Sequence, residues 1–362
     1  MVTRDEVARR AGTSSAVVSY VLNNGPRPVS PVTRARVLAA IEELGYRPNA
    51  VARSLRARRT WTLGLVVPDN SNPFFAEFAR AIEDVAFEHG YTLLLGNAME
   101  DDTREASYIR TFLDRQVDGL LLISVGQGAV SMKALSGSQT PLVIVDRLLP
   151  GVRAATITVD NQAGGYLATR HLLEHGHTRI GCLSGPSDLT PSAERHRGWV
   201  RALSEAGLRR PGTLQARSDF SRHGGYVTAR ELLRRRQPPT ALFALTDQQG
   251  IGALRAAAEL GARVPEELAI VSFDGIPESG FTLPGLSTMQ QPIEAMARRA
   301  VDRLLQLLTQ PDGQPTHDVF PVELLRFLER VTPPEPTNEE LAGSKADSDA
   351  WASATDRPQA GY

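Results

Sequence analysis

From Leu63 onward the chain alternates short apolar runs with longer amphipathic stretches. The run LGLVVP at 63–68, for example, is followed by the helical pattern FAEFARAIEDVAFEHG at 75–90. Strands bounded by Gly or Pro and separated by about 10–15 residues of helical pattern are typical of parallel βαβ units. The alternation begins again with ITVDN at 157–161 and continues to AIVSFDG at 269–275. We therefore expect an α/β core with two similar lobes.

The composition is that of a globular protein with room for several cores. The chain has 362 residues, of which 41% are hydrophobic and 22% charged, which is enough for two or three domains. No window approaches the roughly 18 consecutive apolar residues of a membrane span, and the N-terminal MVTRDEVARR lacks the apolar region of a signal peptide. We expect a cytoplasmic protein without membrane contact. Cys182 is the only cysteine, which excludes intrachain disulfides and cysteine-based structural zinc sites.

Charge is distributed unevenly along the chain. Residues 1–60 contain eleven arginines and four acidic residues, a net charge of +7 that leaves −8 for the other 302 residues. A basic segment of this size is expected of a protein that binds phosphate groups, such as those of nucleic acids. A solvated, arginine-rich surface is the alternative that charge alone leaves open.

The basic segment has the pattern of three short helices. Thr3-Arg4-Asp5-Glu6 has the spacing of a capping box, and Gly12 supplies a turn after the first helix. Ser14 can cap a second helix, from Ser15 to about Asn23. Ser30-Pro31 predicts the start of a third, with apolar Val37, Leu38, Ile41 and Leu44, which ends at Gly45. Two helices around a glycine turn favour a helix-turn-helix domain over a plain three-helix bundle.

The sequence of this segment closely resembles that of the LacI/GalR family of bacterial transcriptional repressors. The resemblance rests on DEVARRAGTSSAVVSYVLNN and VSPVTRARVLAAIEELGYRPNAVARSLR, and it continues to about residue 330. It implies an all-α helix-turn-helix head at residues 1–48, with the second helix in the major groove of DNA. Ser15, Ala16 and Tyr20 would read bases, while Ser14, Ser19 and Asn23 would lie near phosphates. Thr3 and Asn49 complete the contacts that we expect from the resemblance. Family members often have arginine where Tyr20 stands, which leaves the bases of the half-site in doubt.

Residues 49–60 match the hinge helix and linker of that family. The segment Asn49–Arg56 is too short for a stable isolated helix, so we expect it to fold only beside its counterpart in a second subunit on DNA. By resemblance, Leu55 would wedge between base pairs in the minor groove, and Arg53 and Arg56 would face phosphates or groove edges. The alternative is an ordinary linker with one apolar residue and solvated arginines.

The resemblance also implies a two-lobed, periplasmic-binding-protein-like core at 61–330. Lobe 1 would comprise about 61–159 and 290–318, and lobe 2 about 160–289 and 319–330. Only the resemblance implies that the chain returns to lobe 1 near residue 290, because the periodicity of the sequence does not show this return. A small molecule held between the lobes would change the separation of the two hinge segments and so control DNA affinity. Residues 331–362 are rich in Pro, Ser, Asp and Ala, which predicts a disordered tail.

The carboxyl ends of the predicted strands are unusually polar, and parallel sheets bind ligands there. By resemblance, the effector-binding residues would be Phe74, Phe75, Ser124, Asp146, Arg195, Phe220, Asp247, Asp274 and Gln291. Carboxylates, a guanidinium group and an aromatic face suit a sugar or a related polar metabolite. Each carboxylate has an alternative role as a helix N-cap, most clearly Asp160 and Asp247, which directly precede helical patterns.

Several motifs in the core have alternative interpretations. Gly126-x-Gly128-x-x-Ser131, with Asp146 twenty positions after Gly126, imitates a dinucleotide fingerprint, but serine replaces the third glycine. His171, His175 and His177 suggest zinc, although Gly176 breaks the helix and no fourth ligand is obvious. We expect Cys182 to be a buried, inert thiol. A catalytic α/β enzyme with a DNA-binding head and a transport-type solute binder remain as alternative functions.

The resulting expectation is an effector-controlled repressor that is not an enzyme and needs no cofactor or metal. Its partners would be palindromic operator DNA, a small-molecule effector and a second copy of the chain. A leucine heptad repeat that could make a tetramer is missing, so we expect a homodimer.

Overall fold

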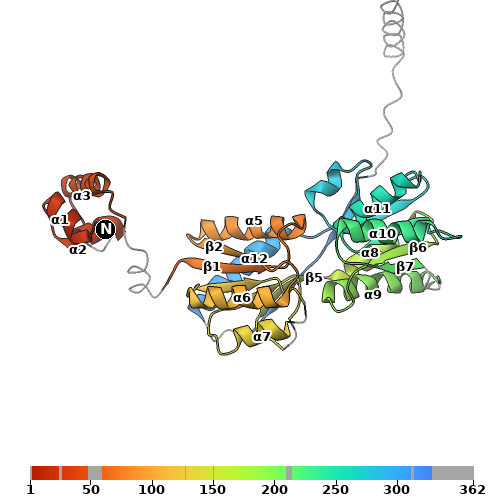
Figure 1. Cartoon of the computed structure of the whole chain (residues 1–362), viewed down its shortest axis with the longest axis horizontal. Helices are drawn as coiled ribbons and strands as arrows, with labels where there is room; N and C mark the ends of the chain where they lie inside the picture. The colour runs from red at the N-terminus through yellow and green to blue at the C-terminus, as the bar shows by residue number, and fades with distance from the viewer. Residues whose placement is uncertain are drawn as a thin grey trace, which may run out of the picture. The chain divides into compact units, whose positions relative to one another are not determined.

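The computed structural model describes residues 2–23, 27–47, 59–126, 128–149, 151–208, 214–310 and 314–327. The predicted hinge helix and the predicted C-terminal tail lie outside these ranges. The chain divides into two compact units: unit 1 comprises residues 1–163, 186–195 and 291–322, and unit 2 comprises 164–185, 196–290 and 323–362. Each unit contains one β-sheet with helices on both faces (Figure 1). None of the helices in the described ranges is long and apolar enough to cross a membrane.

The head, residues 2–47, contains three helices. They are α1 (Arg4–Ala11), α2 (Ser15–Asn23) and α3 (Pro31–Leu44). The expected capping box is present, because the Glu6 amide donates to the Thr3 hydroxyl and the Thr3 amide donates to the Glu6 carboxylate. Ser30 caps α3 as predicted.

The apolar sides of these helices form one small core. It contains Val7, Val18, Val21 and Val37. Leu38 points elsewhere and is 49% exposed. The head therefore has its own core, as its periodicity predicted.

Unit 1 contains a six-stranded, all-parallel sheet in the order β11-β5-β4-β3-β1-β2. The strands are β1 (Thr62–Val67), β2 (Thr92–Asn97), β3 (Gly119–Leu122), β4 (Leu142–Val145), β5 (Ala155–Val159) and β11 (His317–Phe320). The helices are α5 (Pro73–Glu88), α6 (Asp102–Asp114), α7 (Ala129–Leu135) and α12 (Ile293–Thr309). Helices α5 and α12 cover one face of the sheet, and α6 and α7 cover the other (Figure 1).

Unit 2 contains the second sheet, in the order β12-β10-β9-β8-β6-β7. The strands are β6 (Ile180–Ser184), β7 (Gln215–Arg217), β8 (Ala241–Ala244), β9 (Ala269–Asp274), β10 (Ser287–Gln290) and β12 (Glu323–Leu325). The helices are α8 (Asn161–Glu174), α9 (Thr190–Glu205), α10 (Arg222–Leu233), α11 (Asp247–Glu259) and the 3-10 helix η2 (Pro277–Phe281), although the first residues of α8 and α9 belong to unit 1. Only β12, among the strands of this sheet, pairs antiparallel with its neighbour.

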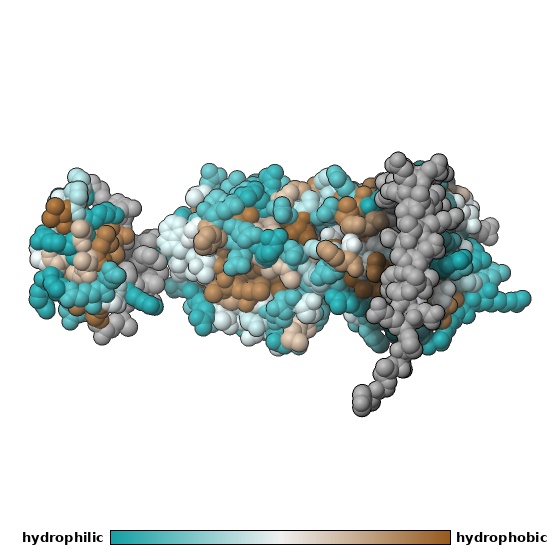
Figure 2. Space-filling view, turned by 90° about the horizontal axis from the view of Figure 1, so that it is seen from above, coloured by the Kyte–Doolittle hydropathy of each residue, from teal (hydrophilic) through white to brown (hydrophobic). Residues whose placement is uncertain are grey.

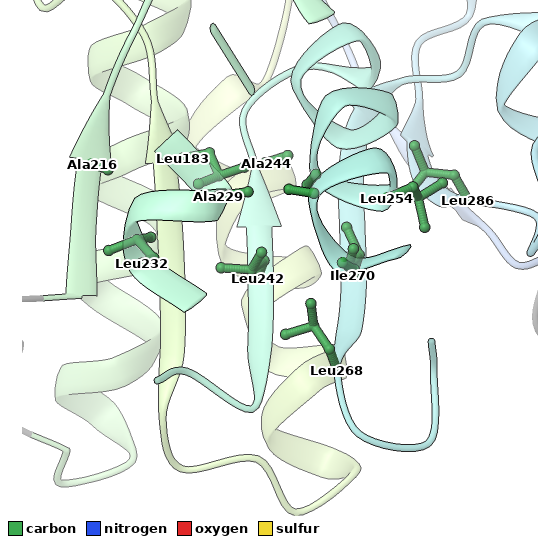
Figure 3. Close-up of a cluster of buried hydrophobic side chains, with 13 residues drawn as sticks. Leu183, Ala216, Ala229, Leu232, Leu242, Ala244, Leu254, Leu268, Ile270 and Leu286 are labelled. Carbon is green, nitrogen blue, oxygen red and sulfur yellow. The ribbon is translucent and has the colours of Figure 1, made fainter. Parts of the chain in front are cut away.

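The core of unit 2 lies between the sheet and helices α10 and α11. Leu183, Leu242 and Ile270 come from three neighbouring strands and point toward Leu232 and Leu254 on these helices (Figure 3). These three strands, β6, β8 and β9, are mainly apolar because helices cover both faces of the sheet. This packing holds the carboxyl ends of the strands, where the predicted ligand-binding side chains lie.

The structure differs from the sequence prediction at the point near residue 320 where the chain passes from unit 1 to unit 2 for the last time. The sequence prediction ends lobe 1 at about residue 318, whereas β11 runs from His317 to Phe320 and pairs with β5. The change of sheet therefore falls after Val322. Residues 186–195, which we assigned to lobe 2, belong to unit 1. The sequence pattern does not predict strands β7, β10, β11 and β12, because they are three or four residues long and mix polar with apolar residues.

Candidate functional site

The outward face of α2 carries the residues predicted to meet DNA. Val18 and Val21 are buried, whereas Ala16 is exposed and Ser15, Ser19 and Tyr20 are partly exposed. The hydroxyl of Ser14 accepts a hydrogen bond from the amide of Val17 at 3.4 Å. A face with small side chains and one tyrosine can approach the edges of bases closely.

Of the remaining residues predicted to contact DNA, the structure describes the side chain of Thr3 only. Thr3 is exposed, but its hydroxyl and amide already bond to Glu6. The side chain of Asn23, and all of Asn49, Arg53, Leu55 and Arg56, lie outside the described residues. These roles stay predictions.

Asp146 is the most unusual group at the carboxyl ends of the unit 1 strands. It directly follows β4, has a left-handed backbone with φ of 63°, and is only 5% exposed. Its Oδ1 atom has no hydrogen-bond partner, while Oδ2 lies 4.0 Å from Nε of Arg147. Burial raises the pKa of Asp146, and the positive charges of Arg195 and Arg147 oppose that rise. A buried carboxylate oxygen without a donor is ready to accept a hydrogen bond from a ligand.

Arg147 organises the loops around Asp146, and we did not predict this role. Its Nη1 donates to the carbonyl oxygens of Ser124 at 3.1 Å and Val125 at 2.9 Å. Both terminal nitrogens also bond to Glu100, and the guanidinium lies 5.2 Å from the centre of the Phe75 ring. The signal in the sequence was its position beside Asp146 at the end of a strand. Arg147 thus joins the loops after β2, β3 and β4 to the start of α5.

The predicted residues Phe74, Phe75, Arg195 and Gln291 of unit 1 are all buried. Phe74 and Phe75 pack edge to face at the start of α5, with ring centroids 5.2 Å apart. The Nε of Arg195 donates to Oδ1 of Asn161 at 2.8 Å. Gln291 is buried at the point where the chain returns to unit 1.

Two side chains at these strand ends have local structural contacts. The hydroxyl of Ser124 is buried and donates to Glu105 at 3.1 Å. Asp160 accepts from the amide of Ala163 at 2.8 Å, so it caps α8, as the alternative interpretation of this residue predicted.

In unit 2, Asp247 makes structural contacts, and its role as an effector contact stays a prediction. Its carboxylate is fully buried and accepts from the hydroxyls of Ser272 and Thr288 and from the amides of Gly275 and Ile276. The resulting network ties α11 to the loop after β9. Its N-cap alternative is wrong, because Thr246 caps α11. With both oxygens occupied by protein donors, Asp247 has little capacity left for a ligand.

The two other predicted residues of unit 2 are placed more favourably. Asp274 ends β9 with a positive φ of 122° and is buried. Phe220 is half-buried and packs against the backbone of Gly185, where any side chain would overlap the ring.

The alternative motifs have structural explanations within their units. Gly128 has a positive φ of 69°, precedes α7 and packs against Leu149, and Ser131 donates to Glu105. Cys182 is buried in β6, and burial raises the pKa of its thiol. Within the described ranges, no three His, Cys, Asp or Glu side chains are grouped as metal ligands. His175 instead bonds to the carbonyl of His171, and His177 to Thr240.

Comparison with known proteins agrees with this division into head and core. The family model "Bacterial regulatory proteins, lacI family" matches residues 3–49, and the model "Periplasmic binding protein-like domain" matches 169–326. The ribose operon repressor of Escherichia coli (strain K12) is 37% identical over 316 residues, which are 87% of this chain and 95% of that protein.

Solved structures are similar over most of the chain. The complex of the transcriptional regulator CelR with cellobiose has a TM-score of 0.68 and 32% identity, covering 90% of this chain and 99% of that one. The Lac repressor dimer bound to operator and the anti-inducer ONPF has a TM-score of 0.80 and 27% identity, covering 90% and 98%. The chain belongs to the LacI family of bacterial transcriptional regulators.

Proposed function

We propose that this chain is a cytoplasmic repressor that binds a palindromic operator as a homodimer and responds to a sugar or a related polar metabolite. The observation that carries the effector part is the buried Oδ1 of Asp146, which lacks a hydrogen-bond donor within the protein. A sugar hydroxyl would supply that donor, and the Phe75 ring would pack against its apolar face. Asp274 and Phe220 of unit 2 stay predicted effector contacts.

Two of the similar proteins support a sugar as the effector. The ribose operon repressor is named for its operon, and the CelR structure contains cellobiose. Carboxylates that accept from vicinal hydroxyls, together with a guanidinium group, are a common means of binding such ligands.

The DNA part of the proposal rests on the head. The face of α2 that carries Ser15, Ala16 and Tyr20 lies opposite the buried Val18 and Val21, as a major-groove reading helix requires. The Lac repressor structure shows a dimer on its operator. A palindrome has two equivalent half-sites, so a symmetric pair of heads is the simplest complement.

Exposed apolar side chains in unit 2 support a dimer. Figure 2 shows that hydrophobic residues gather at several places on the surface. Phe281, at the end of η2, is 89% exposed, and Leu283 is 97% exposed. Two large apolar side chains this close in sequence would be stabilised by contact with a second copy.

The test begins with selection of DNA from a random duplex pool by the full-length protein. We expect enrichment of a palindromic sequence, and D-ribose or cellobiose should change the affinity for that sequence in a mobility-shift titration. Recovery of no sequence preference would overturn the DNA part, and no response to a panel of sugars would overturn the effector part.

Asp146→Asn tests the proposed site directly. Because it removes the charge at nearly constant shape, we expect at least a tenfold loss of sugar affinity, which corresponds to about 1.5–3 kcal/mol for a hydrogen bond to a charged group. Asp160→Asn is the matched control, since Asp160 follows a strand of the same sheet but caps a helix. Calorimetric titration that gave equal affinities for wild type and Asp146→Asn would contradict the site.

A further inference from the structure

Glu105 is a fully buried acidic residue on α6 that belongs to none of the motifs discussed above. Its Oε1 accepts from the hydroxyls of Ser124 at 3.1 Å and Ser131 at 2.5 Å. Its Oε2 accepts from the amide of Val125 at 2.5 Å. Three donors from the segment after β3 and from α7 therefore converge on one carboxylate.

The opposite side of the same loop is held by Arg147. The carbonyl oxygens of Ser124 and Val125 accept from its guanidinium, and that guanidinium lies beside Asp146 and over Phe75. The two loop residues thus lie between a carboxylate and a guanidinium group. Any movement of the loop would move Arg147, and with it the surroundings of the Asp146 carboxylate.

The charge on Glu105 determines how firmly its side of the loop is held. Hydrogen bonds to an ionised carboxylate are roughly twice as strong as those to a neutral group. Protonation would weaken all three bonds, since a carboxyl group offers fewer and poorer acceptor positions. The loop should therefore be ordered when Glu105 is charged and looser when it is neutral.

The surroundings bring protonation closer to neutral pH. Burial raises the pKa of Glu105, the hydrogen bonds from Ser131, Val125 and Ser124 oppose that rise, and the negative charge of Asp102 adds to it. On the other side of the loop, the charged group is Arg147, whose guanidinium binds the carbonyl oxygens of Ser124 and Val125.

We propose that Glu105 is a positioning residue of the effector site: as a carboxylate it holds the Ser124–Val125 loop against Arg147, and on protonation it loosens that loop. The inference rests on the proposed function, because the loop matters for regulation only if the effector binds beside Asp146. Effector binding then becomes weaker as the pH falls, although Glu105 touches no ligand.

Loosening of the loop differs from general unfolding in its dependence on pH. Because the folded chain raises the pKa of Glu105, protonation of this group favours the folded state. Acidification therefore loosens the loop, while the contribution of Glu105 to the free energy of unfolding becomes more favourable to the folded state. Were Glu105 simply a packing residue, loop order and overall stability would change together.

Hydrogen exchange of the full-length protein tests the proposal. Mass spectrometry would follow the peptide at 119–126 in wild type, Glu105→Gln and Ser131→Ala, at several values of pH from 7.5 to 5, with rates corrected for intrinsic exchange. In wild type we expect protection of this peptide to fall at least tenfold on acidification, while a peptide at 180–184 in β6 stays unchanged. Glu105→Gln should show the low protection at every pH.

Ser131→Ala provides the sharper comparison. The Ser131 hydroxyl stabilises the charged form of Glu105, so its removal should move the loss of protection to higher pH. It also keeps the test decisive if Glu105→Gln does not fold. Equal protection in all folded proteins at every pH, or an unchanged midpoint in Ser131→Ala, would overturn the proposal.

A calorimetric titration with D-ribose separates this inference from the proposed function. Parallel loss of loop protection and of D-ribose affinity in acid would support both. Loss of protection with pH-independent D-ribose affinity would overturn the positioning role. If no sugar bound at any pH while the loop still responded, the proposed effector class would fail, and with it the link between the loop and regulation.

Discussion

Single side chains in this protein act through partners that are distant in sequence. Arg147 binds the carbonyl oxygens of Ser124 and Val125, more than twenty residues away, and Glu100 at a separation of 47. Asp247 is held by donors at positions 272 to 288. Both residues follow apolar strands, yet Asp247 closes a network and Arg147 supports a candidate site. Residue type and position at a strand end were therefore insufficient to separate the two roles.

His171 makes stability depend on pH. Burial, together with the positive charges of His175 and Arg326, lowers its pKa from 6.5 to about 4. As pH falls below 6.5 the unfolded chain binds a proton that the folded chain does not, so this contribution to stability is present above pH 6.5 and is lost as pH falls toward 4. Allowing for solvent around this half-buried ring, we expect a loss of about 1 kcal/mol between pH 7 and pH 5.

Urea denaturation of wild type and His171→Gln at both values of pH would measure this loss. We expect the wild-type free energy of unfolding to fall more than that of the variant. The same pH dependence in the two proteins would argue against the role of His171.

Helices and strands form here largely as their local signals indicate, but glycine sets how closely two of them approach. A methyl group at Gly252 on α11 would overlap the carbonyl oxygen of Arg222 on α10, and one at Gly225 would overlap the backbone of Gln249. Backbone atoms of packed helices cannot move aside as a flexible side chain can. The two glycines therefore permit the close contact of α10 and α11.

Gly252→Ala should destabilise unit 2. Alanine gains about 1 kcal/mol of helix propensity over glycine, but forcing α10 and α11 apart should cost about 2–3 kcal/mol, so we expect a net loss of about 1–2 kcal/mol. Thermal melting would show this as a lower transition temperature. Ala258→Ser, on the exposed side of the same helix, is the control and should change little. An unchanged melting temperature in Gly252→Ala would show that separating the helices costs no more than the helix propensity gained, about 1 kcal/mol.

We expect the protein to act as a homodimer. If Phe281 and Leu283 contact a second copy, the double variant Phe281→Ser/Leu283→Ser should sediment as a monomer at micromolar concentration. Its affinity for the selected palindrome should fall at least tenfold, because each head alone has only half of the phosphate and base contacts. Leu167→Ser, at another exposed apolar position, should remain dimeric. A double variant that remained dimeric would place the contact elsewhere.

The family, the three-helix head and the α/β character of the core could be predicted because each depends on residues close together in sequence. Thr3 and Glu6 define a cap within four positions, and the strands around Leu65 and Leu121 are apolar because covered parallel strands must be. The resemblance added Asp146, which the structure places in a buried and incompletely bonded position. The predicted hinge contacts remain predictions.

Tertiary structure alone decided the roles of Glu105, Arg147 and Asp247, and the strand β11 at which the chain leaves unit 1. Helix caps and apolar periodicity act over a few residues, so they can be read along the chain. The bonding state of a buried charge instead depends on which distant donors the fold brings within about 3 Å of it, and no local pattern contains that information.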